Sequence, residues 1–188
     1  MKRVLVVFGA GAASGEISPI SKRAIRSVGP LLNTQRFDVF VLAGSSGFGE
    51  SESSLLKKYT EGLALPVPSL LEVEGWCLWE KTLNVIKALK KTFPDETCFI
   101  TAIVLHSEMR RVLTMLKDAV AFFEEGHLIS LYPAGEHYDP NAQKRKFRSA
   151  RKLRFHENLS YLFYRLFPFL LPTQKSFCRA LSAMRVRL

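Results

Sequence analysis

Five short apolar runs, each followed by small or polar residues and then by a segment of helical periodicity, set the pattern of this chain. The first run, residues 1–8, is continuously apolar after two basic residues and ends abruptly at Gly9. A short run of this kind, rich in β-branched residues, predicts a strand that is buried on both faces. The other four runs cover residues 37–43, 69–73, 97–105 and 128–132.

The segments between these runs carry apolar residues at helical spacing. They cover residues 19–32, about 50–59, 75–91 and 107–123. Ser18 and Pro19 form a favoured helix start, with a serine N-cap and a proline in the first turn. Strands that alternate with helices of this length imply parallel β-α-β units with right-handed crossovers. We therefore expect an α/β fold with helices on both faces of a five-stranded parallel sheet, in the order 3-2-1-4-5.

Composition limits the class of protein. The chain has 188 residues, 47% of them hydrophobic, which is enough for one domain with a full core. Its cysteines, Cys77, Cys98 and Cys178, are widely spaced and form no Cys-x-x-Cys pair, so they indicate neither a zinc site nor a disulfide framework. No apolar run reaches the ~18 residues that a membrane span needs, and the run from Val4 is short for a signal peptide. We expect a cytoplasmic protein, with association at a membrane surface as the open alternative.

The formal charge of +10 gathers toward the C-terminus. Residues 143–154 hold seven Lys and Arg residues and no acid, and an aromatic helical segment, residues 155–167, follows. Such a region could bind anionic lipid headgroups or nucleic acid, or it could be a terminal helix that packs its aromatics on the sheet. No known nucleic-acid motif accompanies it, so nucleic acid is disfavoured. An anionic membrane surface could be a partner of residues 144–188, although a packed terminal helix is the favoured interpretation. We expect one domain over residues 1–170 and a basic amphipathic tail over 171–188.

The loop after the first strand is a candidate ligand cradle. Residues 9–15 read Gly-Ala-Gly-Ala-Ala-Ser-Gly, and such small residues let a ligand approach the backbone. The helix start at Ser18 would offer free N–H groups to an anion. The spacing misses Gly-x-Gly-x-x-Gly by one residue, and no Gly-Lys-Ser/Thr follows, so we assign neither a dinucleotide fingerprint nor a P-loop. The alternative is a tight turn that packs helix on strand.

Polar residues follow the other strands. The expected strand ends place Gly9, Gly44, Glu72 and His106 at one edge of the sheet, where ligands of parallel α/β folds bind. A histidine and a carboxylate could act as general acid and base, and Arg23 or Arg110 could hold a phosphate or carboxylate. The alternatives are a capping or core histidine at position 106 and a helix-dipole role for the acids in residues 50–52. No two-histidine ligand spacing points to a metal.

These residues, in this order, resemble a known pattern. The matching positions are Gly9-Ala10-Gly11, Arg23, Gly44-Ser45, Glu50-Ser51-Glu52, Glu72, Glu80, and His106 with Arg110 or Arg111. The chain resembles the YdcF-like, SanA-like and ElyC-like bacterial proteins, which share the domain of unknown function numbered 218. It departs from their pattern at Ala10 and Ser45, where the family has glycine, and at Lys81, where it has asparagine.

The resemblance implies a Rossmann-like three-layer sandwich over roughly residues 3–170. It also implies a small anionic or nucleotide-like ligand, either S-adenosylmethionine or a phosphorylated metabolite of the cell envelope, without an established reaction. In that interpretation His106 and Glu72 are the catalytic candidates. The ligand-binding candidates are Gly9, Gly11, Arg23, Gly44, Ser45, Glu50, Glu80 and Arg110. The departures favour binding over turnover, and the alternative function is a non-catalytic accessory protein of the envelope or membrane surface.

Overall fold

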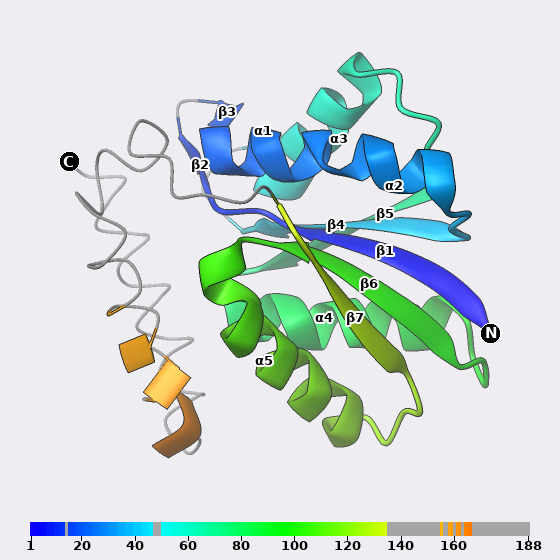
Figure 1. Cartoon of the computed structure of the whole chain (residues 1–188), viewed down its shortest axis with the longest axis vertical. Helices are drawn as coiled ribbons and strands as arrows, with labels where there is room; N and C mark the ends of the chain where they lie inside the picture. Colours follow the sequence, from blue (N-terminus) through cyan, green and yellow to red (C-terminus); the bar gives the residue numbers. More distant parts are fainter. Residues whose placement is uncertain are drawn as a thin grey trace.

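A parallel five-stranded sheet forms the centre of the computed structural model, which describes residues 1–13, 15–46, 50–134, 155, 158–159, 161–162 and 164–166. Its strands lie in the order β5 (Ser69–Gly75), β4 (Val39–Ser45), β1 (Lys2–Phe8), β6 (Cys98–Val104) and β7 (Leu128–Pro133), as Figure 1 shows. Counted along the chain, these five strands have the predicted order 3-2-1-4-5. The labels differ because a hairpin that we did not predict, β2 (Ala12–Ala13) with β3 (Glu16–Ile17), forms a separate small sheet. The basic stretch 143–154 and the tail 171–188 lie outside the described residues.

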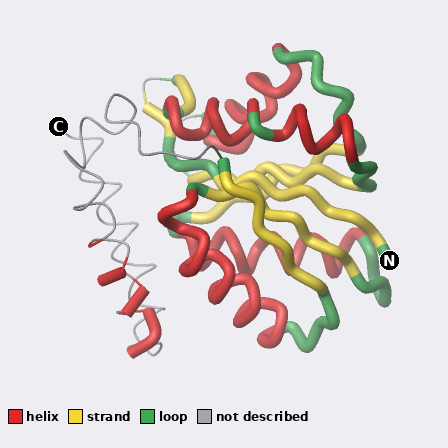
Figure 2. Tube along the Cα trace, viewed as in Figure 1, coloured by secondary structure: helices red, strands yellow, loops and turns green. Residues whose placement is uncertain are grey.

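Helices cover both faces of the sheet (Figures 1 and 2). One face carries α1 (Pro19–Arg26), α2 (Val28–Thr34) and α3 (Glu52–Gly62), and the other carries α4 (Leu78–Thr92) and α5 (Met109–Phe122). A short 3-10 helix, η1 (His106–Glu108), joins β6 to α5. This arrangement confirms the α/β, Rossmann-like three-layer sandwich.

The burial of strand β1 on both faces explains why its sequence is continuously apolar and does not alternate with polar residues. Val4 and Val6 belong to the core beneath α4 and α5, whereas Leu5 and Val7 belong to the core beneath α1, α2 and α3. All four residues are fully buried. Successive side chains of a strand point to opposite faces, so a strand that is covered on both sides needs an apolar residue at every position.

Two predicted helix boundaries were wrong. The segment 19–32 contains two helices, α1 and α2, with Ser27 as the turn residue between them. The N–H of Ser27 still donates to the carbonyl of Arg23, as in a helix. Pro30 lies in the first turn of α2 and has no N–H to continue a single helix across the break. Helix α4 begins at Leu78 rather than at residue 75, so Trp76 precedes the helix and is not part of its inner face.

Candidate functional site

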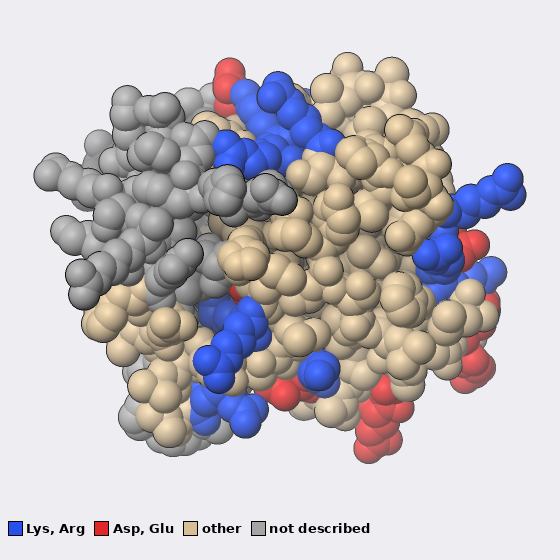
Figure 3. Space-filling model, viewed as in Figure 1, with Lys and Arg blue, Asp and Glu red and all other residues tan. Residues whose placement is uncertain are grey.

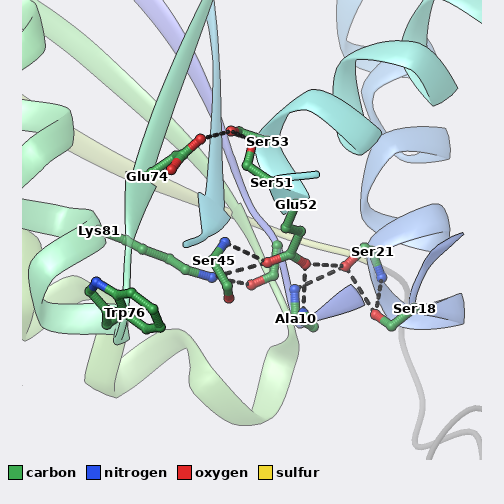
Figure 4. Close-up of polar contacts among 12 residues, drawn as sticks. Ala10, Ser18, Ser21, Ser45, Ser51, Glu52, Ser53, Glu74, Trp76 and Lys81 are labelled. Carbon is green, nitrogen blue, oxygen red and sulfur yellow. Dashed lines mark hydrogen bonds and ion pairs between the residues drawn. The ribbon is translucent and has the colours of Figure 1, made fainter. Parts of the chain in front are cut away.

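The carboxylate of Glu52 lies at the centre of the carboxyl ends of β1 and β4 (Figure 4). Glu52 is the first residue of α3, and its side chain is 1% exposed. It accepts hydrogen bonds from the backbone N–H of Gly11 at 2.6 Å and of Ser45 at 2.7 Å. The Ser21 hydroxyl, in α1, donates to the same carboxylate at 3.2 Å. One side chain thereby links the loops after two neighbouring strands to two helices.

Lys81 reaches the same point from the opposite helical layer. It lies in α4, and its side chain is 5% exposed. Its Nζ lies 3.3 Å from Oε2 of Glu52 and donates to the carbonyl of Gly9 at 2.9 Å. Because α3 and α4 cover opposite faces of the sheet, the ion pair joins both layers across the end of the sheet (Figure 4).

The surroundings keep Glu52 ionised. Burial by itself would raise the pKa of this carboxyl. The charge of Lys81 and the backbone N–H groups of Ser45 and Gly11 outweigh burial, so the pKa of Glu52 lies below its ordinary value of 4.5. The site therefore contains a permanent internal anion at neutral pH, held by donors that an external anion would otherwise use.

Glycine ends the strands because the helices approach there too closely for a side chain. A Cβ at Gly9 would overlap the carboxylate of Glu52, and one at Gly44 would overlap the backbone nitrogen of Ser53. A Cβ at Gly75 would lie 2.7 Å from the backbone nitrogen of Lys81. These contacts agree with the alternative interpretation, in which the small residues form tight turns. The glycines allow the starts of the helices to pack against the ends of the strands.

Serines complete the network at the start of α1. Ser18 is the N-cap, as predicted, and its Oγ accepts from the N–H of Ser21 at 3.1 Å. The Oγ of Ser21 accepts from the N–H of Ala10 at 2.9 Å. The loop that leaves β1 is thus held at Gly9, Ala10 and Gly11 by three different side chains, and its backbone is fixed before any ligand arrives.

The structure therefore brings some predicted site residues together. Gly9, Gly11 and Ser45 contact the Glu52–Lys81 pair through their backbone atoms, and Gly44 packs directly beside it. The contribution of these residues is to bind Glu52 and Lys81.

Other predicted residues lie elsewhere. Glu72 was expected at a strand end, but β5 continues to Gly75, so Glu72 is mid-strand and accepts from Ser54 Oγ at 2.9 Å and from Lys57 Nζ at 3.1 Å. Strands β4 and β1 separate β5 from β6, and three strand spacings amount to roughly 14 Å. Glu72 and His106, which follows β6, therefore lie well apart.

Two further acids have local partners. Glu50 is exposed and forms an ion pair with Lys58. Glu80, in the first turn of α4, accepts a hydrogen bond at 2.9 Å from the N–H of Trp76, which precedes the helix. Both residues were predicted to bind a ligand, and in the structure both contact other residues of the chain.

The cationic candidates and the histidine lie around the edge. His106 is exposed and follows β6, the neighbour of β1 in the sheet. Arg110 is exposed in the first turn of α5, with its guanidinium 4.3 Å from the ring centroid of Tyr161. Arg23 is half-buried in α1.

Glu52, Lys81 and Ser21 were missing from the predicted site. The spacing of the two charged residues from buried residues of their own helices could have identified them. Lys81 precedes the buried Val85 and Leu89 at steps of four. Glu52 precedes the buried Leu56 and Thr60 in the same way. Opposite charges on the apolar stripes of two helices indicate a buried ion pair.

Comparison with known proteins adds no assignment, since no family model and no curated protein matches the chain. The resemblance to the YdcF-like proteins stays a prediction.

Proposed function

We propose that this protein binds a small anionic or nucleotide-like molecule at the carboxyl edge of its sheet, between the loop after β1 and η1. The topology of the sheet carries the proposal. From β1 the chain passes over one face to β4, and from β6 it passes over the other face to β7. Loops that leave neighbouring strands in opposite directions open a crevice, and ligands of open α/β sheets bind at this point.

The side chains around this point of the sheet suit an anion. In the loop after β1, the N–H of Gly11 and the carbonyl of Gly9 already bind the Glu52–Lys81 pair. A ligand would therefore contact the outer side of this loop, where Ala10 is exposed. His106 and Arg110 are exposed beside it on the β6 side. The Arg110 guanidinium lies over the Tyr161 ring, and the planar arrangement of its N–H donors suits a phosphate or carboxylate.

Binding is favoured over catalysis. His106 could move a proton, but Glu72 lies three strands away and is paired with Lys57. The resemblance to the YdcF-like family adds S-adenosylmethionine and phosphorylated envelope metabolites as candidates for the ligand.

Isothermal titration with ADP, S-adenosylmethionine and inorganic pyrophosphate tests the proposal. We expect at least one of them to bind, and His106→Ala and Arg110→Gln each to weaken its affinity about tenfold, the usual scale for a charged hydrogen bond of ~1.5 kcal/mol. Lys91→Gln, an exposed cation in the last turn of α4, is the matched control and should leave affinity unchanged. The proposal is wrong if none of the three compounds binds, or if the control weakens binding as much as the site variants.

A further inference from the structure

Four large apolar side chains form an exposed stripe on the helical segment near the C-terminus. Phe155, Leu159, Leu162 and Leu166 are 70%, 52%, 51% and 59% exposed. The described residues of this segment are helical. At about 100° per residue, the steps of four, three and four place all four side chains within roughly 60° of arc. A stripe of this kind normally faces a core or a partner.

Contacts on the opposite side of the segment determine which way the stripe faces. Tyr164 is 5% exposed, donates its hydroxyl to Asp118 of α5 at 2.7 Å, and packs its ring 5.7 Å from that of Trp79 in α4. Burial first, and then the hydrogen bond to Asp118, raises the pKa of Tyr164. Tyr161 lies against Arg110. Through these two tyrosines the segment contacts α4 and α5, while the four apolar side chains of the stripe stay exposed.

We propose that this stripe docks onto an anionic lipid surface, a function that goes beyond the binding of a small ligand. Charge decides the kind of surface. Residues 143–188 contain twelve of the 27 Lys and Arg residues but one of the 17 Asp and Glu residues, so the rest of the chain is close to neutral. Over the described residues on the face shown in Figure 3, basic side chains lie in separate groups with acidic ones among them. The attraction to an anionic surface therefore comes from the sequence that flanks the stripe.

The mode of association is interfacial. An apolar helix face flanked by Lys and Arg buries its side chains among lipid headgroups while the basic residues attract the anionic lipids. Within the described part of the chain, no helix has the length and apolar character to cross a bilayer. The stripe thus supplies shallow insertion, and the flanking charge supplies selectivity for anionic lipid.

The same charge argues against a second copy of the chain as the occupant. Residues 143–154 precede the stripe with seven basic side chains, and Lys175, Arg179, Arg185 and Arg187 follow it. Two copies that paired through the stripe would each carry these positive charges next to it in the sequence, and like charges repel. An anionic surface removes that repulsion and turns the charge into attraction.

Vesicle flotation of the full chain tests the proposal. We expect partition onto vesicles of phosphatidylcholine with phosphatidylglycerol, weak partition onto phosphatidylcholine alone, and a decrease with added salt. Leu159→Gln with Leu162→Gln should lower the partition coefficient at least tenfold. The matched control is Leu63→Gln with Leu128→Gln, which changes two other exposed leucines, 36% and 52% exposed, outside the stripe. All variants should keep the melting temperature of the wild type, because the altered side chains are exposed.

Three results would overturn the proposal. The first is equal flotation of the stripe and control variants. The second is an absence of binding to anionic vesicles. The third is a wild-type dimer in sedimentation that the stripe substitutions dissociate, since the face would then belong to a second copy.

Discussion

At the scale of single residues, the Glu52–Lys81 pair decides the geometry of the carboxyl edge. Both side chains are almost fully buried, and the Glu52 carboxylate takes backbone donors from the loops after β1 and β4. Burying two charges is costly, and their attraction and hydrogen bonds roughly offset that cost. The pair therefore contributes position more than net stability, and the loss of one partner leaves a charge without compensation.

Lys81→Met tests this account. We expect it to lower the free energy of unfolding by about 3–5 kcal/mol, because Glu52 would be left as an unpaired buried carboxylate. Adding Glu52→Gln should restore part of the loss, since the double variant buries no charge. Lys87→Met, at an exposed position of the same helix, should change stability by no more than about 0.5 kcal/mol. Denaturant titrations of the four proteins measure these differences.

The same variants predict a pH dependence. The folded pKa of Glu52 lies below 4.5, so its contribution to stability is complete above pH 4.5 and is lost as the pH falls through the folded value. The stability difference between the wild type and Lys81→Met should narrow as the pH falls toward the folded pKa of wild-type Glu52, because protonation removes the charge that Lys81 compensates. A difference that stays constant with pH would mean that the cost comes from lost packing of the lysine stem instead.

At the scale of elements, the close approach of helix starts to strand ends holds the layers together. Gly44→Ala should destabilise the protein by about 1–3 kcal/mol, because the methyl group would overlap the backbone of Ser53 in α3. Gly62→Ala is the control, since Gly62 ends α3 with open space around its Cβ position. It should stabilise by up to about 1 kcal/mol through helix propensity. Thermal unfolding of both variants measures the opposite signs, and a neutral Gly44→Ala would disprove the close-approach account.

The sequence predicted strands and helix starts better than it predicted the connections between them. Strand β1 was recognisable because burial on both faces removes all polar positions from its core. The β2–β3 hairpin was missed because two-residue strands of alanine and of Glu16–Ile17 carry no measurable period. Glu52 was recognised as a helix-start acid, but its role depends on Gly11, 41 residues away, and spacing in the sequence does not encode that contact.

At the scale of the whole molecule, the strand order followed from the alternation of strands and helices and from the apolar character of β1. The residue at which each strand ends could not be predicted from the same pattern. Glu72 was expected at the carboxyl end of its strand because its apolar run ends nearby, yet β5 pairs with β4 as far as Gly75. Pairing continues through polar residues on an outer strand, because one side of such a strand is open to water.

This distinction between central and outer strands predicts a gradient of amide hydrogen exchange. Val4 to Val7 of β1 are fully buried between β4 and β6, whereas the residues of β7 are half-buried or exposed and, among the described residues, pair with β6 alone. Amides of β1 should exchange only through global unfolding, and those of β7 at least about tenfold faster through local opening. Exchange measured by NMR, corrected for intrinsic rates, tests this order. Equal protection of β1 and β7 would require a further segment of the chain to pair with β7, which contradicts its place at the edge of the sheet.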